Sequence, residues 1–188
     1  GNPMAIALRT HYAQHGVLNH VDIHAGDAYA CLRDVGNEME NVRFFGGQYG
    51  ITSGPTSPSW PMAIADVYFE GQKKAAVVTR NASISFVNMV VKNAPIGILM
   101  EKGVTDRVYI EESQFENVGT AVVTTVEDEA VNQINILGLL CKNVPTLLTT
   151  PGESVPVAHK IYNVKDLTYG LIIPEMGAIG DFDLTYDV

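Results

Sequence analysis

SISFVNMVVKNAPIGILME, residues 83–101, is the stretch from which the fold can be predicted. Apolar residues alternate in two short runs that break at Asn88 and Asn93, and a third apolar run follows. Alternation with a period of two is typical of β-strands that bury one face. Three short strands and two tight bends in about twenty residues predict one coil of a β-solenoid.

The same pattern recurs along the whole chain. Apolar residues stand four and two positions before nearly every equivalent of Asn93, and Ser113 alone breaks this rule. Strand-like content with a period of about 24 residues indicates a repeat architecture. Gly and Asn at the repeated position suit a bend with left-handed backbone geometry. The positions equivalent to Asn93 are Ala25, Gly46, Gly71, Asn117 and Asn143.

Three further segments carry a family resemblance: HVDIHAG (20–26), DVGNEMENVRFFGGQYGI (34–51) and FEGQKKAAVVT (69–79). With the Asn bends that follow apolar pairs, they resemble the right-handed parallel β-helix of the pectate-lyase-like superfamily. They are most similar to secreted glycan-degrading members, such as the family 55 type of glycoside hydrolase and its bacterial relatives. The resemblance implies an all-β, right-handed parallel β-helix, a glycan substrate and a secreted or periplasmic location.

The resemblance also bears on the domain organisation. The V-x-D-[FY]-G-A-x-G-D-G stretch with which such domains usually start is absent. We therefore expect residues 1–188 to be one β-helix segment of about eight coils, cut from a longer helix. The rest of the parent protein, or another chain, would then cover the open strand edges at its ends.

Composition and charge limit the partners. The chain is 46% hydrophobic and has a formal net charge of −9, which argues against nucleic acid and, more weakly, against strongly anionic glycans. No apolar run approaches the roughly 20 residues of a membrane span, so no membrane partner is expected. Cys31 and Cys141 lie about five coils apart, too far for a disulfide, and are expected to be inert core thiols.

The best candidates for catalysis are Glu38 and Glu40. Met39 between them is expected to face the core, which places both carboxylates outward on one face about 7 Å apart. Glycosidases use pairs of carboxyl groups at similar separations, one as acid and the other as base or nucleophile. The alternative interpretation is a solvated acidic edge.

Further residues are candidate sugar contacts. Asp34 and Arg43 belong to the same polar cluster, although Asp also favours turns for structural reasons. Tyr109 and Glu111 should extend the outward row three coils away, about 14 Å from Glu40, a distance that suits separate subsites. Trp60, in the inserted loop TSGPTSPSWP (52–61), is either a stacking platform for a sugar or a lid over the apolar flank of its coil.

Neither a metal nor a cofactor is expected. Four histidines fall within fourteen residues, but a zinc site needs ligands that converge, and we interpret these as surface and bend residues. The motifs of nucleotide-binding, nucleophile-elbow and zinc-protease sites are absent. The histidines are His11, His15, His20 and His24.

Three functions remain open. The first is a glycoside hydrolase that uses Glu38 and Glu40. The second is a polysaccharide lyase, for which Tyr109 with Arg107 is the one cluster that could supply the base, often with calcium. The third is a non-catalytic glycan-binding or structural β-helix of the tailspike or adhesin type.

Overall fold

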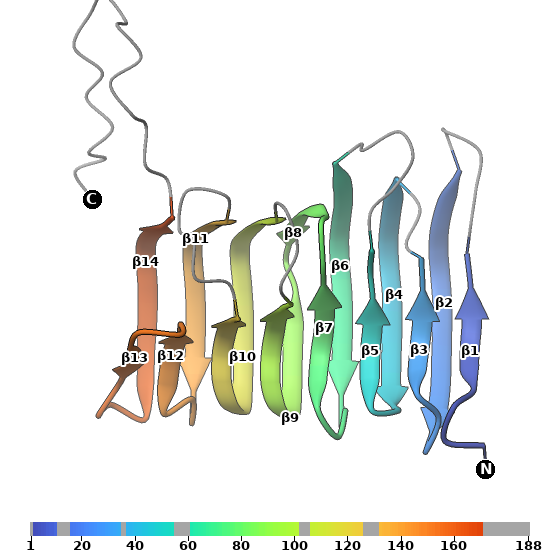
Figure 1. Ribbon diagram of the computed structural model, residues 1–188, viewed down its shortest axis with the longest axis horizontal. Helices are drawn as coiled ribbons and strands as arrows, with labels where there is room; N and C mark the ends of the chain where they lie inside the picture. The colour runs from blue at the N-terminus through green and yellow to red at the C-terminus, as the bar shows by residue number, and fades with distance from the viewer. Residues whose placement is uncertain are drawn as a thin grey trace, which may run out of the picture.

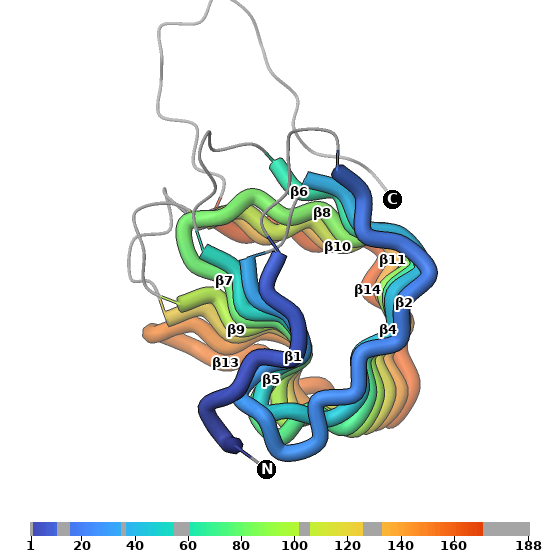
Figure 2. Tube along the Cα trace, turned by 90° about the vertical axis from the view of Figure 1, so that its right-hand side faces the viewer, coloured from blue at the N-terminus to red at the C-terminus, as the bar shows by residue number. Residues whose placement is uncertain are grey.

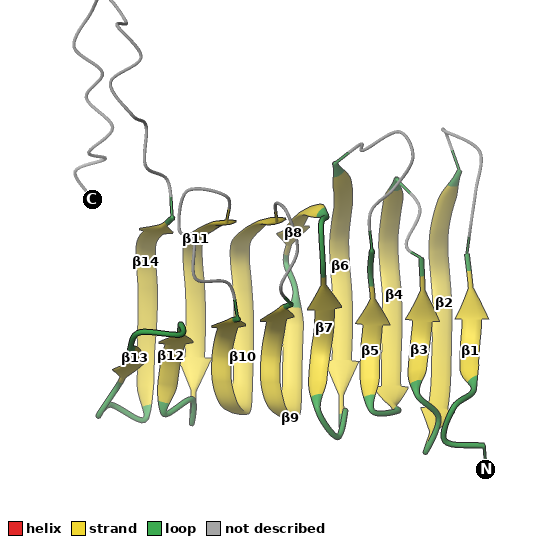
Figure 3. Cartoon of the chain, in the orientation of Figure 1, coloured by secondary structure: helices red, strands yellow, loops and turns green. Residues whose placement is uncertain are grey.

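A computed structural model describes residues 2–10, 16–34, 37–54, 61–101, 106–125 and 132–170. Within these ranges the regular structure is β-strand throughout, and no helix is long and apolar enough to cross a membrane (Figure 3). The strands, in chain order, are β1 (Ile6–Arg9), β2 (Val17–Gly26), β3 (Ala30–Arg33), β4 (Glu38–Gly46), β5 (Tyr49–Thr52), β6 (Met62–Glu70), β7 (Ala75–Thr79), β8 (Ser83–Val87), β9 (Val90–Met100), β10 (Asp106–Thr124), β11 (Asn132–Lys142), β12 (Thr146–Thr149), β13 (Ser154–Pro156) and β14 (Ile161–Tyr169).

The strands stack as a parallel β-helix, which confirms the predicted fold class (Figure 1). Seen from the N-terminal end, the chain turns clockwise as it recedes, so the helix is right-handed (Figure 2). Each coil has three sides, which we call the first, second and third faces. The first face begins each coil, as at Glu38–Glu40 of β4; the second follows the first bend, as at Val42–Phe45; the third follows the second bend, as at β5.

Successive coils stack in register, about 24 residues apart. On the first face, for example, Ile84 pairs with Val108 and Val108 with Ile134. The helix makes about five turns rather than the eight expected from the sequence. One reason is that β13 and β14 run antiparallel to β12 and β11, so that Asn163 and Lys165 do not continue the parallel series.

Two columns of left-handed residues form the bends. Asn93 has φ 56° and Asn117 has φ 55°, as the Gly/Asn pattern predicted. The equivalent residue in the first coil is Gly26 rather than Ala25, because the pairing of β2 with β4 shifts register between His24 and Gly26. The first-bend column comprises His20, Asn41, Asp66, Asn88, Glu112 and Gly138, and the second-bend column Gly26, Gly46, Gly71, Asn93, Asn117 and Asn143.

Hydrogen bonds between side chains connect the bends of neighbouring coils. The amide of Asn117 donates to the side-chain oxygen of Asn93 at 3.1 Å, and Asn143 donates to Asn117 at 3.0 Å. In the first-bend column, Asn88 donates to the carboxylate of Asp66 at 2.6 Å. Side-chain amides thus fix the coil register at the corners, where the chain turns away from the strand ladder.

The interior is filled by stacked apolar columns. The rings of Phe44 and Phe69, one coil apart, stack at 4.6 Å between centroids. Gly50 packs closely against the Phe69 ring, since a Cβ added at Gly50 would come within 2.5 Å of that ring. Cys31 and Cys141 are both free and fully buried, which confirms them as core residues, and burial raises the pKa of each thiol to about 11.

Candidate functional site

The outer side of the first face carries the predicted carboxylate row. Glu38 and Glu40 are both exposed on β4, and Met39 between them is 3% exposed. Strand pairing places Tyr109 and Glu111 three coils further along the same two outward columns. The columns run Glu38–Ala63–Ser85–Tyr109–Asn135 and Glu40–Ala65–Val87–Glu111–Leu137.

A shallow depression, which we call the first-face trough, extends along this face from Val17 of β2 to Ser85 and Val87 of β8. Its volume is about 250 Å³, and Glu38 and Glu40 border it. Its floor is low because the outward residues of the next two coils include Ala63, Ala65 and Ser85. The arrangement combines polar acceptors at the rim with a surface that an extended ligand could lie on.

Tyr109 is half-buried at the far end of the row. Burial, and then a hydrogen bond from its hydroxyl to the Glu111 carboxylate, raise the pKa of Tyr109. A lyase base must lose its proton near neutral pH, so a raised pKa opposes that role. Tyr109 and Glu111 are better suited to contact hydroxyl groups of a ligand.

The structure does not bring Arg43 and Asp34 to this face. The bend at Asn41 separates Glu40 from Arg43, which lies on the second face and binds Asp22 through two hydrogen bonds of 2.7 and 2.5 Å. Asp34 follows β3 on the third face, with φ 61°. Trp60 lies outside the described residues.

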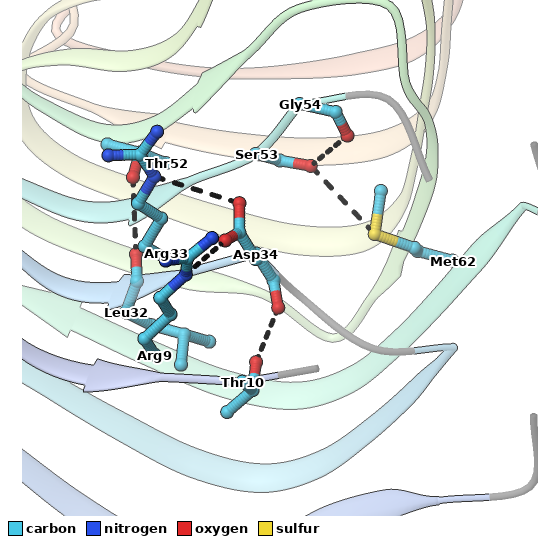
Figure 4. Close-up of polar contacts among 9 residues, drawn as sticks. All are labelled: Arg9, Thr10, Leu32, Arg33, Asp34, Thr52, Ser53, Gly54 and Met62. Carbon is cyan, nitrogen blue, oxygen red and sulfur yellow. Dashed lines mark hydrogen bonds and ion pairs between the residues drawn. The ribbon is translucent and has the colours of Figure 1, made fainter. Parts of the chain in front are cut away.

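A larger depression, which we call the third-face hollow, lies where strands of the third face end. Its volume is about 410 Å³, and residues from four successive coils line it. At one side, Asp34 accepts a hydrogen bond from Arg9 Nε at 2.7 Å and lies 3.7 Å from Arg33 Nε (Figure 4). The lining residues are Tyr29, Arg33, Asp34, Thr52, Ser53, Gly54, Val78, Arg80, Asn81 and Glu101.

The sequence interpretation missed this hollow. Its residues come from chain segments about one period apart, and none of the segments is distinctive alone. A signal in the sequence is a charged or amide residue directly after three of the four third-face strands that border the hollow, whereas Ser53 follows β5. It occurs at Asp34 after β3, Arg80 and Asn81 after β7, and Glu101 after β9.

Asp106 is a buried acidic residue. It begins β10 and is 1% exposed. Its Oδ1 accepts hydrogen bonds from Thr79 Oγ1 at 3.1 Å and from the backbone N–H groups of Ala82 and Arg107 at 3.2 and 3.1 Å. Oδ2 is buried without a partner in the described part of the chain. Burial outweighs these hydrogen bonds and raises the pKa of Asp106 to about 7.

The histidines give no metal centre within the described ranges, where no group of three or more His, Cys, Asp or Glu residues could hold a metal ion. His20 occupies a first-face bend, as expected, and His24 stacks on Phe45 at 4.6 Å. His11 and His15 lie outside the described residues.

Comparison with known proteins adds no family to these observations: the chain matches no protein-family model and no curated protein sequence. The structure itself establishes the fold class, an all-β parallel β-helix.

Proposed function

We propose that this chain is a secreted or periplasmic glycan-binding β-helix that holds a saccharide chain in the first-face trough and hydrolyses it at Glu38 and Glu40. The observation that carries the proposal is the position of these two carboxylates, side by side on one outward face and bordering a low-floored trough. The resemblance of several segments to the pectate-lyase-like superfamily and family 55 glycoside hydrolases supports the choice of a glycan.

The length of the row suits an extended oligosaccharide. Each coil advances by about 4.8 Å, so the three steps from Glu38 to Tyr109 span about 14 Å. Ala63 and Ser85 occupy the intervening outward positions in the same column, and their small side chains leave room for sugar rings. Carboxylates at one end and the Tyr109–Glu111 pair at the other supply acceptors for sugar hydroxyls.

The chemistry follows from the separation of the two acids. Alternate residues of one strand lie about 7 Å apart, within the roughly 6.5–9.5 Å that inverting glycosidases use. One carboxyl would protonate the glycosidic oxygen, and the other would remove a proton from an attacking water molecule. No described residue donates a hydrogen bond to either carboxylate, so both are available to a ligand.

A second candidate is a glycan-binding β-helix without catalysis. It is favoured by the exposure of both Glu38 and Glu40 and by their neighbours on the next coil, Ala63 and Ala65, which cannot position either carboxylate. The raised pKa of Tyr109 leaves the lyase function with less support.

The test is product analysis on a panel of polysaccharides that includes a β-1,3-glucan. Hydrolysis yields new reducing ends without the ultraviolet absorption of an unsaturated product. We expect Glu38→Gln and Glu40→Gln each to lower the rate by about 10²–10⁴-fold. Glu153→Gln, which changes an exposed carboxylate between β12 and β13, is the matched control and should leave the rate unchanged.

The outcomes separate the candidates. Retention on a glycan without any product supports the non-catalytic function. Unsaturated products would establish a lyase. Wild-type hydrolysis by both glutamine variants would remove Glu38 and Glu40 from the mechanism.

A further inference from the structure

The third-face hollow has the shape of a binding site for a small ligand. Its lining includes the Thr52 hydroxyl, the Asn81 amide and the ring of Tyr29, a mixture that recognises hydroxylated molecules by hydrogen bonding and ring contact. Gly54 leaves a gap in the lining, because a Cβ built there meets no atom within 4 Å. The hollow shares no residue with the first-face trough.

The described charged residues around the hollow have a positive net charge, whereas the net charge of the whole chain is negative. Asp34 is already neutralised by Arg9 and Arg33. Arg80 and Glu101 also line the hollow, and no described residue forms an ion pair with either of them. Among the described residues, three guanidinium groups against two carboxylates leave a local charge of +1, on a chain whose net charge is −9. A guanidinium at the wall of a hollow that forms no ion pair with any described residue is suited to bind an oxyanion through two parallel hydrogen bonds.

The wall that carries Arg80 is held in place from the interior. Thr79 precedes Arg80, and Ala82 follows Asn81; both donate hydrogen bonds to Oδ1 of the buried Asp106. The backbone N–H of Glu101 donates to the Thr79 carbonyl at 2.8 Å, which fixes the neighbouring strand end. The Arg80 backbone therefore has a defined position, and less entropy is lost when a ligand binds there.

We propose that the third-face hollow binds a monosaccharide-sized polyhydroxylated ligand that carries one oxyanion group. Arg80 binds the oxyanion, Arg33 donates to further oxygens, and the Glu101 carboxylate accepts hydrogen bonds from hydroxyl groups. The oxyanion can come from a carboxylate, as in a sugar acid, or from a sulfate ester, as in a sulfated sugar.

Binding is measured by calorimetry and by NMR titration with three probes: D-glucuronate, D-glucose 6-sulfate and D-glucose. We expect at least one of the two anionic probes to bind at least tenfold more tightly than glucose. Their relative affinity then identifies the source of the oxyanion.

Three variants localise the site. Arg80→Met removes the guanidinium and should weaken anionic-probe binding at least tenfold while leaving glucose binding unchanged. Gly54→Leu fills the gap in the lining and should weaken all three probes. Lys165→Met, which removes an exposed positive charge on β14, is the matched control and should bind like the wild type. Circular dichroism and a thermal melt check that each variant is folded.

Several results would overturn the proposal. One is equal affinity for glucose and both anionic probes, since the oxyanion would then contribute nothing. Others are the absence of binding by any probe, or an equal loss in Arg80→Met and Lys165→Met, which would mark non-specific charge attraction. A folded Gly54→Leu protein with unchanged affinity would place the binding outside the hollow. None of these results depends on Glu38 and Glu40, so the proposed hydrolysis stands or falls separately.

Discussion

The buried carboxyl of Asp106 should make the stability of the β-helix depend on pH. Its pKa is about 7 in the folded chain, against an ordinary value of 3.8. Well below pH 3.8, Asp106 is protonated in both the folded and the unfolded chain, so it does not lower the free energy of unfolding. Between pH 3.8 and about 7 the unfolded chain loses the proton first, so the unfolded state is progressively favoured. Above about pH 7, Asp106 is ionised in both states, and the free energy of unfolding is lowered by the full cost of ionising Asp106 in the folded chain.

The penalty follows from the gap between the two pKa values, which is about 3. Each unit corresponds to about 1.4 kcal/mol, so ionising Asp106 in the folded chain costs about 4 kcal/mol. Asp106→Asn keeps the oxygen that Thr79 and Ala82 bind but cannot ionise. Relative to the wild type, we expect the variant to gain about 4 kcal/mol in free energy of unfolding between pH 4 and pH 8.

Urea unfolding of both proteins at pH 4 and pH 8 measures this quantity. Taking the difference between the two pH values cancels the pH-independent effect of placing an amide at the unpartnered Oδ2 position. Asp166→Asn, which changes an exposed carboxylate on β14, is the control and should show little change between the two pH values. A gain below about 1 kcal/mol for Asp106→Asn would refute the reasoning that burial dominates the pKa of Asp106.

Three further predictions test the fold. Asn117→Gly should lower the free energy of unfolding, measured by chemical denaturation, by about 1 kcal/mol, because it removes the side-chain hydrogen bonds to Asn93 and Asn143 but allows the φ of 55°. Asn117→Ala should lower it by about 1 kcal/mol more, because Ala is strained at that φ. Equal losses in the two variants would mean that the left-handed backbone contributes nothing. Gly50→Ala should lower the free energy of unfolding by about 1–3 kcal/mol, because the added Cβ would overlap the Phe69 ring. The control Gly152→Ala, which has open space around it, should leave the free energy of unfolding nearly unchanged. An unchanged free energy of unfolding in Gly50→Ala would disprove the close packing. Cys31 and Cys141 should react with a thiol reagent only upon unfolding, and rapid labelling of the native protein at pH 8 would contradict their burial.

The repeat could be predicted from the sequence because the same physical demands recur in every coil. Alternating apolar residues fill the interior, and Gly or Asn meets the left-handed geometry of each bend; both patterns are visible in residues 83–101 alone. Placing Glu38, Glu40, Tyr109 and Glu111 in two outward columns needed only the period of two and the coil length.

The features that the sequence did not reveal depend on contacts between coils. The reversal of β14 was missed because alternation fits a parallel and an antiparallel strand equally well. The burial of Asp106 was missed because Asp ordinarily favours loops, and its hydrogen-bond donors, Thr79 and Ala82, come from the preceding coil. The third-face hollow was missed because Arg33, Arg80 and Glu101 are brought together only by stacking.

The central functional claim is that a glycan lies along the first face at Glu38 and Glu40. A crystal structure of Glu40→Gln, soaked with an oligosaccharide of the polysaccharide that the wild type cleaves or retains, tests it most directly. We predict sugar rings over Ala63 and Ser85, with a glycosidic oxygen within hydrogen-bond distance of the Glu38 carboxyl. An oligosaccharide bound on another face, with the trough empty, would contradict it.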